Sequence, residues 1–238
     1  MKAGIIAAGK GERLKNGGIF TPKPLIRLGG VPIIERTIMA AINAGANYIA
    51  CIVNDIEKEV SEYLKSKSWP VTFRLVVKTT PNSMESLFNL SPFLDEPFLL
   101  LTVDSVYPFD MLKKFVNNAQ HFNADGVLAV TNFVDDEKPL WVKMDSNNKI
   151  FIIGDEAIPT SYITAGFYYF RPNIFKLINK ARKMDLKALR EFLALIIKNG
   201  YDIYGLSVKK VIDLDHPEDI KKAESFLRSI SSEGIGNI

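Results

Sequence analysis

The sequence predicts an α/β fold in which a mostly parallel, mixed β-sheet is covered by helices on both faces. Short runs of β-type residues alternate with segments of helical periodicity, which is typical of parallel strands joined by helices. Two of these runs, residues 2–7 and 98–103, are almost entirely apolar, as expected of strands that are buried on both faces. We therefore expect a single-domain, Rossmann-like three-layer sandwich over residues 1–229, followed by a flexible tail at 230–238.

The composition is that of an ordinary globular protein without a nucleic-acid or membrane partner. Of the 238 residues 47% are apolar, and 30 basic residues nearly balance 27 acidic ones, so no basic surface for nucleic acid is predicted. No apolar stretch reaches the roughly 18 residues that cross a membrane. The single cysteine, Cys51, cannot form an intrachain disulfide, which suits a reducing compartment. We therefore expect a cytoplasmic protein.

In the first half of the chain, local sequence signals mark where helices begin and end. Pro32 opens a helix whose isoleucines recur on one face, and Gly45 ends it. Asn82 and Ser83 can cap a later helix. In chain order, we expect strands at 2–7, 48–53, 71–77, 98–103 and 126–131, and helices at 32–44, 55–66, 84–90 and 109–121.

The second half of the chain has a different pattern. The turn-type tetrapeptide at 145–148 separates two strand-like segments and predicts a hairpin. Pro172 opens a helix after a long aromatic strand. We expect strands at 139–144, 149–153, 161–170, 201–207 and 210–214, and helices at 172–183, 186–198 and 217–228.

The loop after the first strand carries glycines that favour anion binding. Gly9 and Gly11 let backbone N–H groups approach an anion closely. A dinucleotide-binding fingerprint requires glycine where Leu14 stands, and a P-loop requires lysine after Gly11, where Glu12 stands. Both motifs are therefore excluded, and the pattern that remains is Gly-x-Gly-x-Arg, which ends at Arg13.

A second cation follows ten residues after this arginine. Pro22 and Pro24 stiffen the backbone on either side of Lys23. A triphosphate requires fixed N–H donors together with cations that reach its oxygens. Arg13 and Lys23 are therefore candidate triphosphate-binding residues, and an ordinary surface loop with solvated cations is the alternative.

This loop resembles the opening motif of the sugar-phosphate nucleotidyltransferases, also called NDP-sugar pyrophosphorylases. The matching segments are Ala7-Ala8-Gly9-Lys10-Gly11-Glu12-Arg13-Leu14 and Pro22-Lys23-Pro24-Leu25. In that family the loop wraps the triphosphate, and the arginine and the lysine bind its oxygens. The resemblance therefore implies catalytic roles for Arg13 and Lys23. It implies that the nucleotide is also bound by Ala7, Ala8, Gly9, Lys10, Gly11 and Glu12.

An acidic residue, Asp104, ends the apolar strand at 98–103. Side chains at the carboxyl ends of strands in open α/β sheets face the ligand crevice. A carboxylate beside phosphates needs a divalent cation between them, and the alternative is a simple turn-forming aspartate. The family carries a metal-binding aspartate after its fourth strand, so the resemblance implies that Asp104 binds Mg²⁺.

A second acidic candidate lies near the end of the chain. Strand alternation puts Asp213 and Asp215 on the same side. Asp213 lies in an apolar run, where a buried carboxylate needs a cation partner. Asp215 begins an Asp-x-x-Glu pattern with Pro217, which is also typical of a capping box at a helix N-terminus. Members of the family carry a similar late Asp-x-Asp, so Asp213 is the implied second metal ligand and Asp215 the alternative.

The segment after the third expected strand is a candidate base-binding segment. A plain capped loop is the alternative, because Asn82 and Ser83 can begin the following helix. In the family this position reads the nucleobase. The resemblance therefore implies that Asn82 and Ser83 contact the base or the ribose.

The acceptor-binding residues are also implied by resemblance. The small-Gly step at Gly166 is similar to the strand that faces the sugar, and a strand glycine can mark the close approach of a ligand. Many sugar enzymes of the family carry Glu-Lys-Pro before this strand, and its lysine holds the sugar phosphate. The equivalent segment here, 154–159, has no lysine, so Lys143 and Lys210 are candidate substitutes.

Together these features predict an enzyme of the nucleotidyltransferase class. It would transfer NMP from a nucleoside triphosphate to a sugar 1-phosphate, or to a similar small phosphate or alcohol phosphate, and release pyrophosphate with Mg²⁺ as cofactor. The nucleobase, the acceptor and the oligomeric state stay open, with a homo-oligomer as one alternative. The rival functions are a non-catalytic nucleotide-binding regulatory module and a molybdenum-cofactor nucleotidyltransferase of the same fold.

Overall fold

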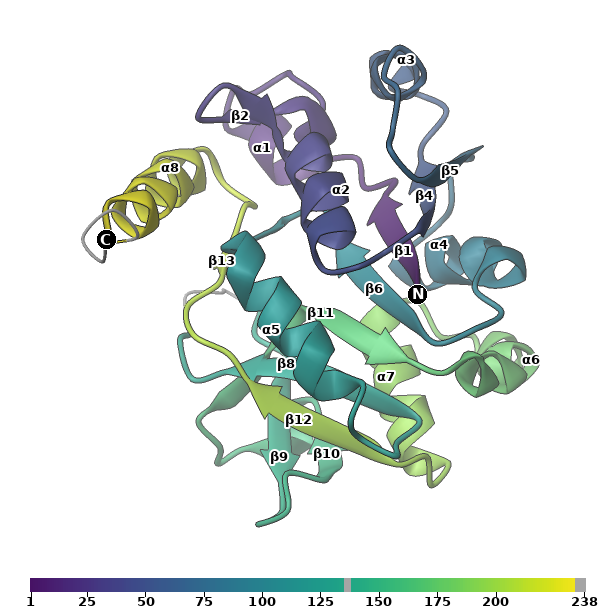
Figure 1. Ribbon diagram of the computed structural model, residues 1–238. Helices are drawn as coiled ribbons and strands as arrows, with labels where there is room; N and C mark the ends of the chain where they lie inside the picture. The colour runs from purple at the N-terminus through teal and green to yellow at the C-terminus, as the bar shows by residue number, and fades with distance from the viewer. Residues whose placement is uncertain (135–137, 234–238) are drawn as a thin grey trace.

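The fold is built around a mixed, nine-stranded sheet (Figure 1). The computed structural model describes residues 1–134 and 138–233, with side chains to residue 230. The strands of the sheet are β1 (Lys2–Ala7), β4 (Tyr48–Val53), β5 (Thr72–Val77), β6 (Phe98–Thr102), β8 (Gly126–Thr131), β9 (Trp141–Met144), β10 (Ile150–Ile153), β11 (Tyr162–Phe170) and β12 (Ile203–Ser207). The order is β10-β9-β11-β6-β1-β4-β5, and β8 pairs with β11 and β12.

The parallel strands of the first half lie around β1. This strand pairs in parallel with β4 and β6, and β4 pairs in parallel with β5. Ile5 stands opposite Cys51 and Leu101, and all three side chains are fully buried. Burial on both faces is the physical reason why these strands are apolar runs instead of alternating ones. The strand β11 is antiparallel to both β6 and β8 and joins the second half of the chain to the first.

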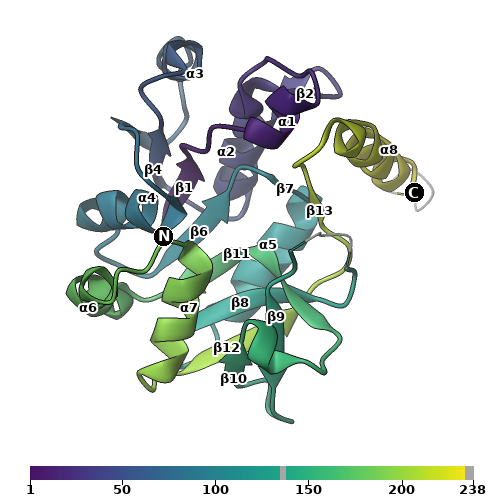
Figure 2. The same ribbon diagram turned by 180° about the vertical axis from the view of Figure 1, so that it is seen from behind.

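Helices cover both faces of this sheet. They are α1 (Glu12–Asn16), α2 (Ile33–Asn43), α3 (Lys58–Lys65), α4 (Ser83–Leu90), α5 (Phe109–Ala119), α6 (Ile178–Lys183), α7 (Leu189–Lys198) and α8 (Pro217–Glu233). One core cluster joins α2 and α5 to Ile5 of β1, and the other joins α4 and α7 to Ile6. Accordingly, α2 and α5 lie in front of the sheet in Figure 1, and α7 lies in front of it in Figure 2. This arrangement confirms the predicted three-layer α/β sandwich.

Two short strand pairs lie outside the main sheet. One is the hairpin of β2 (Arg27–Leu28) and β3 (Val31–Pro32), and the other joins β7 (Ser105–Val106) to β13 (Ile212–Asp213). The strand expected at 210–214 is therefore only two residues long. Ile212 and the flanking Val211 and Leu214 are buried and hold this segment against the core while the strand pairs with β7. The pairing puts Asp213, a candidate metal ligand, opposite Ser105.

The element boundaries depart from expectation at several places. The expected loop after β1 contains α1 and a 3-10 turn, η1 (Lys23–Leu25), and the expected helix at 172–183 begins as a 3-10 turn, η4 (Pro172–Leu177). The last helix continues to Glu233, so residues 230–233 of the expected tail are helical, and 234–238 lie outside the described residues. Over the described part of the chain, the helices are too short or too polar to cross a membrane.

Candidate active site

A cavity of about 550 Å³ opens at the carboxyl ends of β1 and β6. The loop after β1, the start of α4 and the segment after β6 all contribute to its wall. Of the residues expected to bind nucleotide, Ala7 alone lies outside the lining, because it packs into the core cluster on the other face of the sheet from Ile6 and Ala8. Those that do line the cavity are Ala8, Gly9, Lys10, Gly11, Glu12, Arg13, Lys23, Asn82 and Ser83.

Gly11 lies where the two cationic parts of the loop pack closely together. Its φ is +62°, a left-handed value that disfavours other residues, and it immediately precedes α1. A Cβ atom at this position would lie 3.3 Å from the Cβ of Lys23. Glycine therefore permits the loop that carries Arg13 to pack closely against the segment that carries Lys23.

Lys23 is buried between two carboxylates. Its Nζ lies 2.8 Å from Oδ1 of Asp215 and 3.4 Å from Oδ2 of Asp104, while only 9% of its side chain is exposed. Burial by itself would lower the pKa of Lys23, but the charges of the two carboxylates outweigh it and raise this pKa. Burial likewise opposes ionisation of Asp104, and the charge of Lys23 nevertheless holds the pKa of that carboxyl below its ordinary value. The lysine is therefore a cation, and Asp104 an anion, at neutral pH.

Asp215 also contacts the other cation of the loop. Its Oδ2 lies 2.5 Å from Nη1 of Arg13. The cap at the start of α8 is made by Asp219, whose Oδ2 accepts hydrogen bonds from the backbone N–H groups of Asp215, at 3.1 Å, and His216, at 2.8 Å. The Asp215 carboxylate is thus directed to the two cations, and the capping role belongs to the fourth residue after it.

A second cavity, of about 220 Å³, adjoins the first and shares Asp104 and Asp215 with it. Asp213 also lines this second cavity, and its Oδ1 accepts a hydrogen bond of 3.0 Å from Oγ of Ser105. Among the described residues, no three acidic or histidine side chains come close enough together to form a metal cage. Three carboxylates on one cavity wall are nevertheless the oxygen donors that Mg²⁺ prefers. The residues present therefore fit a divalent cation that keeps part of its ligand shell as water or phosphate.

Gly166, a candidate acceptor-binding residue, lines the second cavity. Its φ is +78°, and an added Cβ would lie 1.9 Å from Oγ of Ser105. Only glycine fits there without moving the serine that bonds Asp213.

The basic residue that lines the second cavity differs from those expected from the sequence. Lys143 and Lys210, both within the described part of the chain, line neither of these two cavities. Lys143 lies in β9, and Lys210 lies over the rings of Phe133 and Phe226. Arg190, near the start of α7, lines the second cavity instead. Arg190 could have been identified from the sequence as a candidate functional residue, because a cation in the first turn of a helix opposes the helix dipole.

Asn82 and Ser83 reach the first cavity from the start of α4. Oδ1 of Asn82 accepts a hydrogen bond of 2.9 Å from the Glu85 N–H, so it caps the helix as expected. Ser83 lines both cavities, and the neighbouring Thr80 hydroxyl lies 2.6 Å from that of Ser86. The capping and ligand-facing interpretations of this segment are therefore compatible, because Asn82 lines the cavity as well.

The fold also occurs in solved structures of other proteins. The inositol-1-phosphate CTP transferase from T. maritima has a TM-score of 0.81 and 20% identity, with 94% of each chain covered. A putative glucose-1-phosphate thymidylyltransferase from Bacillus anthracis, solved with a sucrose, has a TM-score of 0.82 and 18% identity, with 96% of this chain and 95% of that chain covered. At this level of identity the likeness establishes the fold.

Sequence relatives extend the comparison. The bifunctional IPC transferase and DIPP synthase of Archaeoglobus fulgidus is 27% identical over 246 residues, which span 100% of this chain but only 46% of that protein. The UTP–glucose-1-phosphate uridylyltransferase AglF of Haloferax volcanii is 23% identical over 243 residues, with 98% of this chain and 99% of that protein covered. The model of one protein family, described as nucleotidyl transferase, matches residues 2–229. The chain therefore belongs to the nucleotidyl transferase family.

Proposed function

We propose that this protein transfers NMP from a nucleoside triphosphate to the phosphate of a sugar 1-phosphate or a similar small phosphate, and releases pyrophosphate. One observation carries the proposal. A glycine-rich loop, two cations and the carboxylates of Asp104 and Asp215 meet in a cavity of about 550 Å³, which adjoins a smaller one of about 220 Å³. A nucleoside triphosphate suits the first space, and a compact phosphorylated acceptor suits the second.

The loop residues would hold the triphosphate. Backbone N–H groups around Gly9 and Gly11 offer donors to phosphate oxygens, and Arg13 offers a bidentate guanidinium. Lys23 would supply a buried point charge to the leaving pyrophosphate. Asn82 and Ser83 at the start of α4 would contact the base or the ribose.

Arg190 would anchor the acceptor phosphate. It is a cation that lines the second cavity together with Gly166 and Asp213. It would therefore do what the family's Glu-Lys-Pro lysine does, which the segment 154–159 cannot do because it contains no lysine. Lys143 and Lys210 are less suitable because they lie outside both cavities.

Asp104 and Asp213 would hold Mg²⁺, since both carboxylates line the second cavity and Asp104 also lines the first. When bound, this cation would act as a Lewis acid at the α-phosphate. The chain's own part is to position these two carboxylates, through the end of β6 and through the Ser105 hydrogen bond to Asp213.

The reaction requires no protein nucleophile. An oxygen of the acceptor phosphate attacks the α-phosphorus, a new P–O bond forms, and the bond from the α-phosphorus to the bridging oxygen breaks on the opposite side. Pyrophosphate leaves with that electron pair, and Arg13 and Lys23 stabilise its charge. Positioning and charge neutralisation therefore account for the catalysis.

We also propose that the protein works in the cytoplasm. There the Cys51 thiol stays reduced and unreactive, because it is buried and burial raises its pKa to about 12.

The test is a pyrophosphate-release screen of the four nucleoside triphosphates against sugar and alcohol phosphates, with and without Mg²⁺. With the best pair, Lys23→Ala and Asp104→Ala should each lower kcat/KM by on the order of 10²-fold, or about 3 kcal/mol. Arg190→Ala should raise the KM for the acceptor without a comparable change in triphosphate binding, and Lys143→Ala is the matched control that should change neither. Near-wild-type rates for Lys23→Ala and Asp104→Ala together, or triphosphate binding without turnover across the panel, would reject the proposal, and the latter would favour a regulatory module.

A further inference from the structure

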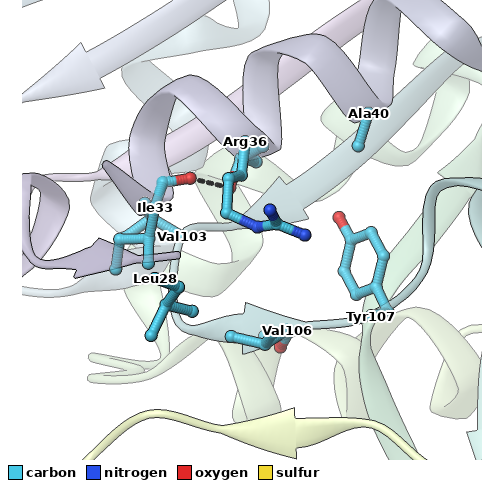
Figure 3. A pocket seen from close by; sticks show the side chains of 9 residues that line it. Leu28, Ile33, Arg36, Ala40, Val103, Val106 and Tyr107 are labelled. Carbon is cyan, nitrogen blue, oxygen red and sulfur yellow. Dashed lines mark hydrogen bonds between the residues drawn. The ribbon is translucent and has the colours of Figure 1, made fainter. Parts of the chain in front are cut away.

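A small cavity lies behind the segment that carries Asp104. Its volume is about 20 Å³, and its wall includes Leu28, Arg36, Thr37, Ser105, Val106 and Tyr107 (Figure 3). Asp104 faces the two substrate cavities, whereas Val106 and Tyr107, only two and three residues later, line this one. The same short segment therefore forms a wall of the candidate active site and a wall of a separate cavity.

Arg36, on α2, brings a positive charge to this cavity. The residue is half-buried, and its guanidinium lies over the ring of Phe109, with 5.5 Å from Cζ to the ring centroid. Within the described residues, no carboxylate forms an ion pair with it, and burial alone lowers its pKa. A partly desolvated cation without an anionic partner is costly.

Tyr107 faces the same space with an unsatisfied hydroxyl. The residue is only 5% exposed, and its buried oxygen has no hydrogen-bond partner among the described residues. Burial and the nearby charge of Asp104 raise its pKa, so the hydroxyl keeps its proton and can donate it. Figure 3 shows this hydroxyl and the Arg36 guanidinium directed into the same space. Buried polar groups without partners are rare in native proteins and call for an explanation.

The chemistry of the wall favours an anion over a water molecule or a cation. No acidic side chain lines the described cavity, and two of its hydroxyls already donate elsewhere: Thr37 to the Ile33 carbonyl at 2.9 Å and Ser105 to Asp213 at 3.0 Å. The remaining donors, the guanidinium and the phenol, need an acceptor. A water molecule could accept from both, but unlike an anion it would not provide Arg36 with an ion-pair partner.

The size of the cavity limits the anion. A volume of about 20 Å³ accommodates a single small ion, because one water molecule already requires roughly 10–15 Å³ on this scale. Arg36 and Leu28 also line a wider cavity of about 200 Å³, so movement of the arginine side chain would connect the two. Glu224, which shares this wider cavity, accepts a hydrogen bond of 3.2 Å from the Gly29 N–H.

We propose that Arg36 and Tyr107 bind a small inorganic anion, of the size of chloride, on the far side of the segment that carries Asp104. The bound ion accepts hydrogen bonds from the guanidinium and the phenol and neutralises the charge of Arg36. It also ties α2 to the segment that contains Ser105, whose hydroxyl orients Asp213. The site stands apart from nucleotidyl transfer, so its test does not depend on the substrates.

The first measurement is crystallographic. Crystals of the full chain are grown in sodium bromide, and anomalous scattering at the bromine edge is collected. The expected result is a bromide peak between the Arg36 guanidinium and the Tyr107 hydroxyl. An ordered water alone at this position, with bromide present, would overturn the proposal.

The second measurement is the melting temperature in sodium bromide and in sodium chloride against sodium gluconate at equal ionic strength. Halide should raise the melting temperature of the wild type in a saturable manner. Arg36→Gln and Tyr107→Phe should each need about tenfold more halide for the same rise, which corresponds to loss of one hydrogen bond to a charged group. Arg74→Gln is the matched control, because Arg74 also lies over a phenylalanine ring, 5.2 Å from Phe93, and should respond as the wild type does.

Two outcomes would contradict the proposal. One is a wild type whose melting temperature is the same in halide and gluconate, and the other is an unchanged halide response in both variants. Tyr107→Phe removes a single oxygen from a ring that stays packed, so it tests the site even where Arg36→Gln does not fold.

Discussion

At the scale of single residues, Asp215 is the group that contacts both cations of the loop. Its two oxygens lie 2.5 Å from Nη1 of Arg13 and 2.8 Å from Nζ of Lys23. In the proposed function a triphosphate or pyrophosphate would bind through the same two cations, so it would have to compete with this carboxylate. Asp215 would therefore hold the cations in position and also oppose the proposed ligand.

Asp215→Asn should strengthen the binding of pyrophosphate measured by calorimetry in EDTA. The substitution keeps the shape of the side chain and removes the competing charge, and we expect an affinity about tenfold higher, or roughly 1.4 kcal/mol. Asp202→Asn is the control, since Asp202 forms an ion pair of 2.5 Å with Lys149 away from both cavities. Unchanged or weaker binding in EDTA, with only the Mg²⁺-dependent rate reduced, would mean that Asp215 acts as a metal ligand instead.

At the scale of elements, an ion pair connects α4 of the first half to α6 of the second. Nε and Nη2 of Arg182 donate to the two carboxylate oxygens of Glu85 at 2.9 and 2.8 Å, and the guanidinium also lies over the ring of Phe88. The hydrogen bond from Arg182 is the main cause that lowers the pKa of Glu85, against the opposing effect of burial. This bidentate pair therefore helps to hold α4, which carries the Asn82 cap, against the second half.

Glu85→Gln should lower the free energy of unfolding at pH 7 by about 1 kcal/mol or less, because Arg182 is half-exposed and solvent screens the pair. A carboxyl with a depressed pKa in the folded state stabilises the fold above its unfolded pKa. This contribution is lost as the pH falls through the folded pKa. The difference between wild type and variant in urea titrations should therefore shrink below about pH 4.5. Glu62→Gln, at an exposed position of α3, is the control, and a difference that grows on acidification would contradict the prediction.

At the scale of the whole molecule, β11 joins the two halves of the chain and both cavities depend on it. It pairs with β6, whose end carries Asp104, and with β8, and it contributes Gly166 to the second cavity. Phe167, the next residue, is fully buried, with its ring 4.8 Å from that of Tyr107 and 5.0 Å from that of Phe115. The core beneath the candidate site is therefore shared between the first and second halves.

Phe167→Ala should destabilise the protein by about 3–5 kcal/mol in denaturant titrations, because it removes a large buried ring and leaves a cavity. Phe151→Ala is the matched control: Phe151 is 48% exposed, and its loss should change the free energy of unfolding by much less. A similar loss in the free energy of unfolding for both substitutions would show that the ring contacts of Phe167 do not stabilise the core as expected.

Part of the fold and of the candidate site was determined by the sequence alone. The apolar run of β1, the glycines after it and the proline-flanked Lys23 are local signals, because chain periodicity and turn chemistry act within a few residues. They predicted the α/β sandwich, the loop and the cavity position of Asp104, which follows from a general property of strand ends in such sheets.

Only the tertiary structure decided the rest. The pairing of β7 with β13 brings Asp213 to Ser105 across 108 positions of sequence, and α7 brings Arg190 to the second cavity in place of the expected lysines. Likewise, neither sequence segment by itself predicts that Arg36 and Tyr107 line the same cavity. Such contacts depend on how distant elements pack, and packing is a property of the whole core and not of any short stretch of chain.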